Sequence, residues 1–250
     1  MKFDIVTIFP SMIEAGLSEG VVSRGIERGL LDIAVHDLRR WTTDRHRSVD
    51  DVPYGGGPGM VMKAEPLMRA VDEVRTTRGA PDAVVLLSPQ GRTFTQAEAG
   101  RFARLGHIVL LCGRYEGMDE RVRDLVATEE VSIGDYVLSG GELAALVVVD
   151  AVSRLVPGVV GDEQSVAEDS FSRGLLDHPH YTRPAEIAGY RVPDVLLSGH
   201  HGDVRRWRRK AALARTLDRR PELIAEAALD DEERALLDEI RRERARRESA

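Results

Sequence analysis

The sequence predicts an α/β fold, with a parallel sheet in the first part of the chain and a small helical domain in the last. Three short apolar runs carry this prediction. Each ends in a glycine-rich polar loop, and with their loops they span Ala83–Gly91, His107–Gly117 and Val131–Glu142. Such runs are typical of parallel strands buried on both faces, and amphipathic stretches alternate with them. Loops at the carboxyl ends of parallel strands bind ligands, and glycine lets their backbone approach the edge of a purine closely. We therefore expect these loops to hold an adenosine-containing cofactor.

Local signals predict further elements of this first part. The chain opens with an apolar strand from Phe3 to Phe9. Apolar residues at a spacing of three and four predict a helix over 65–75, and the sequence Thr95-Gln-Ala-Glu98 resembles a capping box that opens another. The segment 142–155 is apolar on almost all sides, which predicts a helix buried on more than one side, inside the fold or at a subunit contact.

The chain changes character after Pro157. Residues 158–170 are polar and acidic without a strong period, which predicts a linker. Beyond it, N-cap acids and a proline at the first helical position open three predicted helices, over 203–217, 221–228 and 231–247. We therefore expect a domain over residues 1–157, a flexible linker over 158–171 and a helical domain over 172–250.

Composition limits the function. The 250 residues carry 35 basic and 42 acidic side chains, a net charge of −7, so the protein as a whole is not a polycation that coats nucleic acid. No apolar run is long enough to cross a membrane, and Asp4 interrupts the place where a signal peptide would keep its apolar core. The single Cys112, inside an apolar run, fits a buried, inert thiol. We expect a cytoplasmic protein without a membrane partner, whose contacts with nucleic acid are local.

One segment of opposite charge could supply such a contact. Between Asp203 and Arg220 the chain carries eight basic and two acidic side chains, with Trp207 among them. A phosphate backbone could dock there, with stacking on the indole as a supplement. The alternative is a solvated helix face in a chain that places arginine at nearly every basic position.

A glycine cluster at Pro53–Met60 invites comparison with a phosphate-binding loop. A Walker A loop needs Gly-Lys-Ser/Thr, whereas Met60 follows Gly59 here, and no Gly-x-Gly-x-x-Gly follows the first strand. Nucleoside triphosphatase and Rossmann dinucleotide chemistry are therefore unsupported, and the bare cluster fits a flexible surface loop. Its neighbour Arg45–Asp51 has the mixed charge of a loop that could close over an anionic polymer.

Several single residues allow both a structural and a chemical role. Asp169 fits a loop acid or a helix cap, and Arg154 fits a side chain that reaches water from the end of an apolar helix. Glu116 and Asp119 could bind a metal or cap a helix. The histidines form two close pairs, His178 with His180 and His200 with His201. We expect neither pair to make a good metal site, because both lack a nearby cysteine and a His-Glu-x-x-His frame.

Five blocks taken together closely resemble the bacterial tRNA (guanine-37-N1)-methyltransferase family, and the match runs nearly end to end. Each block alone is moderately specific, but their order and spacing leave little room for chance. The blocks are Pro53–Met60, Leu87–Gly91, Cys112–Arg121, Ser132–Glu142 and Leu176–Pro184. The resemblance implies an S-adenosylmethionine-dependent methyltransferase of the knotted SPOUT class, whose chain forms a deep trefoil knot at the cofactor site. It also implies a homodimer with active sites shared between subunits, which agrees with the apolar helix over 142–155.

Carried over residue by residue, the resemblance places the cofactor on the three loops already singled out, with the adenine read mainly by backbone groups. It matches the family's proposed general base to Asp169 and its guanine-stabilising arginine to Arg154. It also suggests that Glu116 aids the sulfonium directly or through Mg²⁺. The implied cofactor contacts are Leu87, Ser88, Pro89, Gly91, Gly113, Tyr115, Glu116, Ile133, Gly134, Asp135, Tyr136, Val137, Leu138, Gly140 and Gly141.

These residue types fit methylation of N1 of guanine 37 in tRNA, beside the anticodon, with tRNA and not DNA as the partner. Guanine N1 becomes nucleophilic only when its proton leaves, and the negative charge then spreads towards O6, so a carboxylate and a cation are both needed. Docking of tRNA would order the linker and bring Asp169 onto the base. Two alternatives stay open: a knotted methyltransferase with another RNA target, such as a ribose hydroxyl, and a catalytically silent RNA-binding protein.

Overall fold

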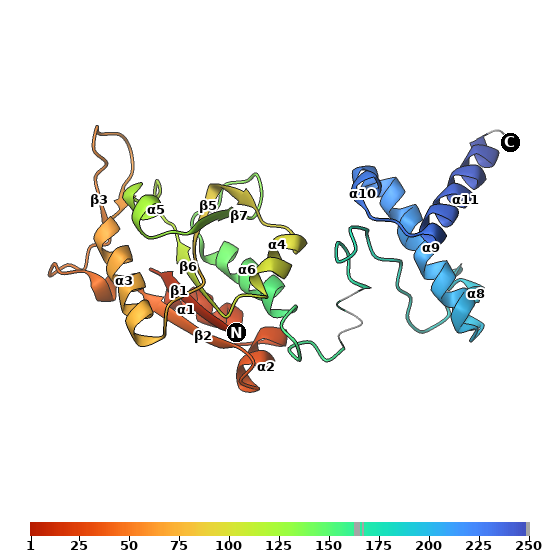
Figure 1. Ribbon diagram of the computed structural model, residues 1–250, viewed down its shortest axis with the longest axis horizontal. Coiled ribbons are helices and arrows are strands. Elements are labelled where there is room, and N and C mark those ends of the chain that lie inside the picture. The colour runs from red at the N-terminus through yellow and green to blue at the C-terminus, as the bar shows by residue number, and fades with distance from the viewer. Residues whose placement is uncertain (163–165, 167, 249–250) are drawn as a thin grey trace. The chain divides into compact units, whose positions relative to one another are not determined.

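The protein folds into two compact units, Met1–Glu163 and Gln164–Ala250 (Figure 1). The structure, a computed structural model, describes residues 1–162, 166 and 168–248. Residues 163–165 and 167 of the predicted linker lie outside the described residues. Each unit is described by itself below.

Unit 1, Met1–Glu163, is built around a five-stranded, all-parallel sheet with strand order β2-β1-β6-β5-β7. The three apolar runs form neighbouring strands of this sheet, as predicted. β6 and β7 lie on opposite sides of β5, so the carboxyl ends of all three strands meet at one edge. The strands are β1 (Lys2–Thr7), β2 (Asp32–Asp37), β5 (Ala83–Thr93), β6 (His107–Cys112) and β7 (Glu129–Ser132).

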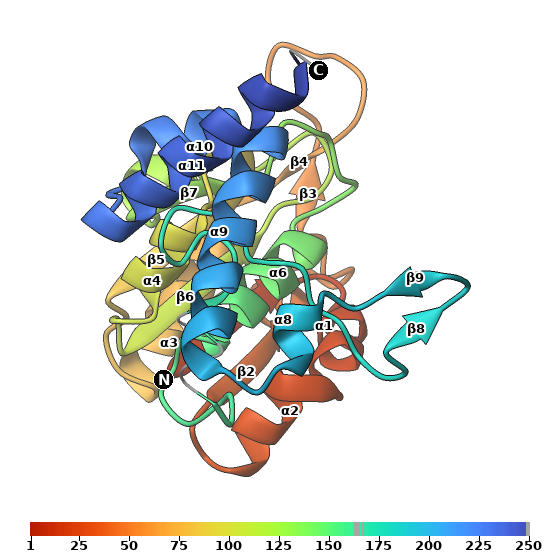
Figure 2. The same cartoon turned by 90° about the vertical axis from the view of Figure 1, so that its right-hand side faces the viewer.

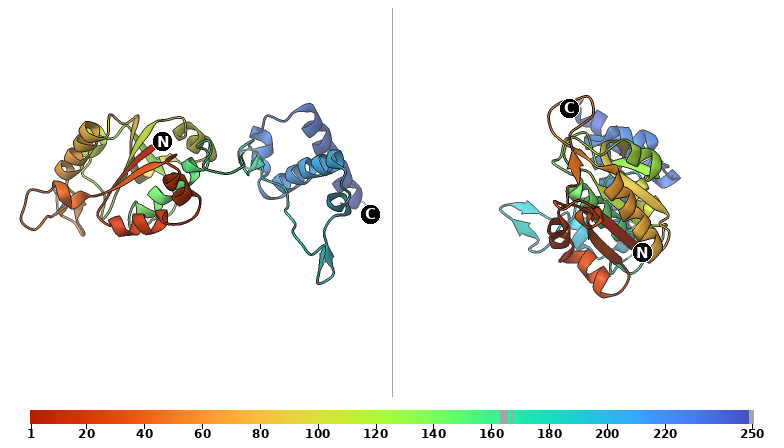
Figure 3. Two further views of the ribbon diagram at one scale, coloured as in Figure 1. Left: turned by 90° about the horizontal axis from the view of Figure 1, so that it is seen from below. Right: turned by 90° about the vertical axis from the view of Figure 1, so that its left-hand side faces the viewer.

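Helices cover both faces of the sheet (Figure 3). One apolar core joins the sheet to α1 (Pro10–Leu17), α2 (Gly20–Glu27), α4 (Gln96–Phe102) and α6 (Glu142–Ser153). The second core joins the other face to the 3₁₀ helix η1 (Leu38–Trp41), α3 (Ala64–Thr77) and α5 (Arg121–Leu125). Successive residues of β5 and β6 alternate between these cores, which explains why both strands are apolar throughout. A short antiparallel hairpin, β3 (Asp50–Asp51) with β4 (Val61–Met62), precedes α3.

Several predicted elements are confirmed with adjusted ends. The first strand ends at Thr7 instead of Phe9, and the predicted helix over 65–75 is part of α3. Thr95 caps α4 as the box predicts, because its hydroxyl accepts a hydrogen bond from the Glu98 amide at 3.4 Å. The prediction for α6 is confirmed, because this helix is buried on most of its circumference. It exposes a stripe at Leu143, Val147 and Asp150.

Unit 2 is mainly helical (Figure 2). The three predicted helices are confirmed as α9 (His201–Arg219), α10 (Pro221–Glu226) and α11 (Asp231–Glu248), preceded by the short α8 (Asp194–Leu197). Their small core is centred on Leu213, Leu236 and Ile240. A two-stranded hairpin, β8 (Glu186–Ile187) with β9 (Tyr190–Arg191), extends from the unit. Among the described helices of the chain, none combines the length and apolar character that crossing a membrane requires.

The buried carboxylate of Asp4 connects β1 to β2, to β6 and to the end of α3. Asp4, in the middle of β1, is 0% exposed and accepts hydrogen bonds from His36 Nε2 and His107 Nε2, at 2.6 Å each. Arg78, directly after α3, pairs with the same carboxylate at 2.8 Å. Burial by itself raises the pKa of Asp4, but the hydrogen bonds from His36, Arg78 and His107 outweigh it and hold the pKa below the usual value. The carboxylate therefore favours the folded state when it is ionised.

We expect Asp4→Asn to lower the free energy of unfolding at pH 7 by about 3–5 kcal/mol, because it removes the buried anion with which Arg78 pairs and which accepts hydrogen bonds from His36 and His107. Since the pKa of Asp4 is depressed in the folded state, its contribution is present above the ordinary pKa of about 3.9 and is lost as pH falls through the folded value. Urea unfolding as a function of pH measures both effects. Asp32→Asn, which removes the exposed second partner of Arg78, is the control and should cost less than about 1 kcal/mol. Equal losses in the two variants would contradict this account.

Candidate functional site

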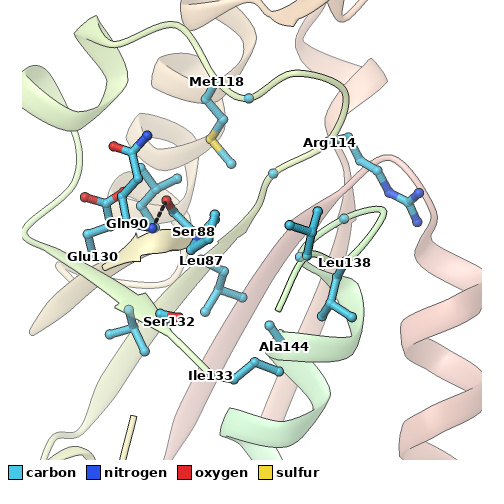
Figure 4. Close-up of a pocket in the computed structure, with 18 of the residues that line it drawn as sticks. Leu87, Ser88, Gln90, Arg114, Met118, Glu130, Ser132, Ile133, Leu138 and Ala144 are labelled. Atoms are coloured by element: carbon cyan, nitrogen blue, oxygen red, sulfur yellow. Dashed lines mark hydrogen bonds between the residues drawn. The ribbon is translucent and has the colours of Figure 1, made fainter. Parts of the chain in front are cut away.

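A cavity of about 460 Å³ opens where β5, β6 and β7 end, and the three glycine-rich loops line it (Figure 4). The chain runs from β5 to β6 on one side and then crosses to β7 on the other side of β5. Ligands of open α/β sheets bind at such a reversal, outside the carboxyl ends of the strands. The structure thus brings together the three loops that the sequence singled out.

The first loop is a bulge inside β5. Leu87 and Arg92 both pair with Val131 of β7, so the residues between them are excluded from the sheet and face the cavity edge. The Ser88 hydroxyl closes the turn by accepting a hydrogen bond from the Gln90 amide at 3.1 Å (Figure 4). A Cβ on Gly91 would lie 2.5 Å from the carbonyl carbon of Glu130, which is a backbone clash. Glycine is therefore required for the bulge to rejoin the strand.

The second and third loops are joined backbone to backbone. The Gly141 amide donates to the Gly113 carbonyl at 2.8 Å, and Arg114 forms a bridge with Gly140. A Cβ on Gly141 would lie 2.8 Å from Cys112 Cα and 2.9 Å from the Gly113 nitrogen, a contact that no side chain allows. The loop after β7 can therefore close on the loop after β6 only with glycine at position 141.

The glycine cluster supports the second loop from outside. The Glu116 amide donates to the Met60 carbonyl and the Met62 amide donates to the Gly117 carbonyl, both at 2.9 Å. Gly59, at φ +79°, has no room for a Cβ because the Glu116 side chain occupies that space. The surface-loop interpretation thus holds for the exposed part around Tyr54, which is 100% exposed, while the end of the cluster is fixed against the site.

A buried ion pair fixes the start of α6. Glu142, 0% exposed, accepts hydrogen bonds from the Thr7 hydroxyl at 2.8 Å and from Arg114 Nε at 3.0 Å. The Arg114 guanidinium also lies over the Phe9 ring, 4.5 Å from its centre. This arrangement ties the end of β1, the second loop and α6 together, so Arg114 serves the shape of the cavity.

Acidic side chains outnumber basic ones around the cavity, and ion pairs neutralise most of them. Arg121 pairs with Asp119 at 2.6 Å, and its hydrogen bonds hold the pKa of Asp119 below the usual value. Asp119, one residue before the N-cap Glu120 of α5, also accepts a hydrogen bond from the Arg121 amide at 3.0 Å. Arg123 pairs with the other two acids beside it, Glu120 and Glu130. Of the described acids that line the cavity, Glu116 is the one without an ion pair.

Tyr115 lies at the rim in a left-handed conformation, with φ +61° and 47% of its side chain exposed. Burial of the rest of the side chain and the nearby Asp50 carboxylate raise the pKa of Tyr115. Its hydroxyl therefore stays protonated and can donate a hydrogen bond at neutral pH.

Thirteen of the fifteen predicted cofactor contacts line the cavity. Gly91 and Asp135 do not. Gly91 is required by the bulge, as described above, and Asp135 lies between two lining residues on the third loop. Lining residues that the sequence analysis missed, such as Gln90, Arg114 and Met118, belong to the same blocks. Their place in those blocks was the only available signal, because their side-chain contacts depend on the fold.

The two predicted catalytic residues belong to different units. Arg154 is the C-cap of α6 in unit 1 and is partly buried. Asp169 belongs to unit 2, where it lines a second cavity, of about 540 Å³, with α9. The structure of either unit alone therefore does not join them.

The histidines at 178 and 180 come together on a carboxylate that the sequence analysis did not connect with them. Asp177 accepts hydrogen bonds from His178 Nδ1 and His180 Nε2, at 2.6 Å each. Burial raises the pKa of Asp177, but these hydrogen bonds lower it below its usual value. The three side chains have the spacing of a possible metal-ligand group, and their hydrogen bonds to one another account for that spacing.

The fold and the cavity define an α/β protein with a cavity of small-molecule size in glycine-rich loops at the carboxyl ends of parallel strands. The chain belongs to the tRNA (guanine-1)-methyltransferase family: the family model described as "tRNA (Guanine-1)-methyltransferase TrmD" matches residues 1–226.

Curated relatives agree with the family model. A tRNA (guanine-N(1)-)-methyltransferase of Pelotomaculum thermopropionicum is 55% identical over 241 residues, which cover 96% of each chain. A protein of the same name from Geobacter metallireducens is 54% identical over 241 residues, 96% of this chain and 98% of the relative. A third, from Chloroflexus aurantiacus, is 56% identical over 228 residues, 91% and 90% of the two chains.

Cys112, at the end of β6 beneath the cavity, should be unreactive in the folded protein. Its side chain is 0% exposed, and burial together with the Glu142 carboxylate raises the pKa of its thiol well above the usual value. We expect no measurable reaction with Ellman's reagent at pH 8 in native buffer, and one equivalent after unfolding in guanidinium chloride, because the thiolate is the reactive form. A full equivalent within minutes in native buffer would show that the strand end opens.

Proposed function

We propose that this protein transfers a methyl group from S-adenosylmethionine to N1 of guanine 37 in tRNA. Family membership supports the reaction class, since the relatives are named for N1 methylation of guanine in tRNA. The observation that carries the proposal is the cavity formed by three glycine-rich loops, which belong to the sequence blocks that resemble the family. As a tRNA-modifying enzyme it would act in the cytoplasm.

The cavity suits S-adenosylmethionine in shape and in charge. Its volume of about 460 Å³ is within the range of small-molecule sites, and its lining combines the glycine-rich loops with apolar side chains such as Leu87, Ile133 and Leu138. Backbone amides and carbonyls there can read an adenine edge. Glu116, without an ion pair, is the acid available to a sulfonium cation or to Mg²⁺. The bound cofactor would supply an electrophilic methyl group.

The proposed catalytic pair completes the chemistry. Asp169 would take the proton from guanine N1, and Arg154 would donate to O6, where the negative charge accumulates. A carboxylate is a weak base towards N1, so proton removal is expected to accompany methyl transfer and not to precede it. Residues 158–171 would bring Asp169 to the base once tRNA is bound.

Homodimerisation is part of the proposal. The exposed stripe of α6 contains Leu143 and Val147, which are 48% and 46% exposed. In the adjoining third loop, Val137 is 92% exposed, although it lines the cofactor cavity. A second copy covering this apolar surface would close the cavity and place active-site residues of both subunits together.

The deep trefoil knot is also proposed, on the basis of chain connectivity. After β7, at one edge of the sheet, the chain returns across β5 to the end of β6. There Gly141 bonds to Gly113 before α6 begins. A return path of this kind beside the cofactor cavity is what a knotted methyltransferase requires.

The first test is methyl transfer from labelled S-adenosylmethionine to a tRNA transcript with guanine at position 37. Label recovered as 1-methylguanosine is expected, and none when that guanine is replaced. Asp169→Asn should lower kcat by about 10²–10⁴-fold, the usual effect of a general base. Asp203→Asn, an exposed acid in the first turn of α9, is the control and should keep full activity. A labelled ribose would favour another RNA target, and no label despite cofactor binding would favour a silent RNA-binding protein.

Gly141→Ala should weaken cofactor binding because its Cβ would push the second and third loops apart. Isothermal titration with S-adenosylmethionine is expected to show at least about a tenfold loss of affinity, which corresponds to 1.4 kcal/mol. Gly100→Ala is the matched control: a Cβ at this position of α4 meets nothing within 4 Å, and alanine favours a helix. Unchanged affinity in Gly141→Ala would refute the role given to the backbone contact.

A further inference from the structure

The five basic side chains over residues 205–210 of α9 divide into two sets, which the sequence could not separate. Those of the first set pair with acids of α11 and of the turn before it. Arg206 pairs with Glu239 at 2.6 Å, and Lys210 pairs with Glu239 at 2.8 Å and Glu243 at 2.7 Å. Arg209 pairs with Asp230, Glu232 and Glu233. These three basic residues hold α9 and α11 together, so their positive charge is largely neutralised within unit 2.

The second set, Arg205 and Arg208, does not pair with α11. Both side chains are exposed and neither has an ion pair among the described residues. They are three residues apart, about one helical turn, and both line the cavity of about 540 Å³ that contains Asp169. Arg208 also lines a neighbouring cavity of about 440 Å³ beside Tyr181. Two guanidinium groups thus line the same cavity as the proposed general base.

The remaining charged groups of this cavity have partners of their own. Arg173 pairs with Glu233 at 2.9 Å, and Asp177 bridges the two histidines described above. No described acid opposes Arg205 or Arg208 at ion-pair distance. An anionic ligand would therefore meet two available cations in this cavity, and a guanidinium is well shaped to bind a phosphate through two parallel hydrogen bonds.

Trp207, expected to stack on RNA bases, is used within the unit. Its ring is partly buried and lies 6.5 Å from the His178 ring in an edge-on arrangement and 6.3 Å from the Tyr181 ring. The indole therefore packs against the loop that carries Asp177, which argues against the supplementary stacking on RNA bases that the sequence suggested.

We propose that Arg205 and Arg208 bind the RNA backbone phosphates next to the guanosine that Asp169 deprotonates, whereas Arg206, Arg209 and Lys210 bind α11 and no RNA. This inference rests on the proposed function, because it takes Asp169 to be the base. Phosphate recognition and proton removal would then both take place at this one cavity of unit 2. RNA docking through these two arginines would thus also deliver the carboxylate to its base.

The test is the salt dependence of tRNA binding by the full-length protein. Each phosphate contact contributes about 0.9 to the slope of log K against log salt concentration on a duplex, and about 0.7 on a single strand. We expect Arg205→Gln and Arg208→Gln each to reduce the slope by about 1 and the double variant by about 2. Arg206→Gln, which removes the same charge one position away, should leave the slope unchanged. Arg208→Lys should retain it, because the charge remains.

Three further readouts keep the outcomes distinct. Affinity for S-adenosylmethionine, whose cavity belongs to unit 1, should be the same in every variant, and far-ultraviolet circular dichroism reports on correct folding of the helices of unit 2. Methylation by the wild-type protein tests the proposed function separately, since binding slopes are measured without turnover. Equal slopes in Arg205→Gln, Arg208→Gln and the wild type would overturn the inference. So would an equal reduction in Arg206→Gln, which would show that the whole basic helix acts as one diffuse charge.

Discussion

The site depends on one close contact, the meeting of the Gly141 and Gly113 backbones. It brings the chain back from the end of β7 to the end of β6 and so closes the cavity between the loops. The same contact fixes where α6 begins, because Glu142 follows at once and is held by Thr7 and Arg114. Since Arg154 ends that helix, the position of a proposed catalytic cation is set by a glycine contact at the helix's other end. The shape of the cavity, the buried ion pair and the position of α6 therefore depend on one another.

Much of unit 1 could be predicted because its signals are local. The strands at residues 83, 107 and 131 are apolar throughout, and the glycines after them mark positions where backbone meets backbone. β2 went unpredicted for the opposite reason: Asp32, His36 and Asp37 interrupt its apolar pattern. His36 is there to bind the buried Asp4 of the neighbouring strand. A polar network inside the sheet is invisible to a hydrophobic pattern, because each member looks unfavourable until its partners are known.

Charge was harder to interpret than hydrophobicity. Eight basic residues against two acids in one segment indicate a docking site only if the surplus stays on the surface. In the folded protein Arg206, Arg209 and Lys210 do not add to a surface surplus of positive charge. They pair with acidic side chains of a helix more than twenty residues further along the chain. The acidic side chains of α11 thus select which basic side chains of α9 remain available. Local composition gives the number of charged side chains, whereas the packing of the helices determines which of them are paired and which remain available.

The separation of the proposed base and cation has a chemical rationale. An aspartate and an arginine in permanent contact stabilise each other's charged forms, which makes the carboxylate a poorer base and occupies the guanidinium. Arg154 stands at the end of a helix of unit 1, and Asp169 stands on a wall of unit 2 that also carries Arg205 and Arg208. With the pair divided between units, the substrate guanine itself would supply the link on the proposed mechanism: N1 for the carboxylate and O6 for the cation. Catalytic competence would then depend on correct RNA docking, which would protect the cofactor from reaction with other nucleophiles.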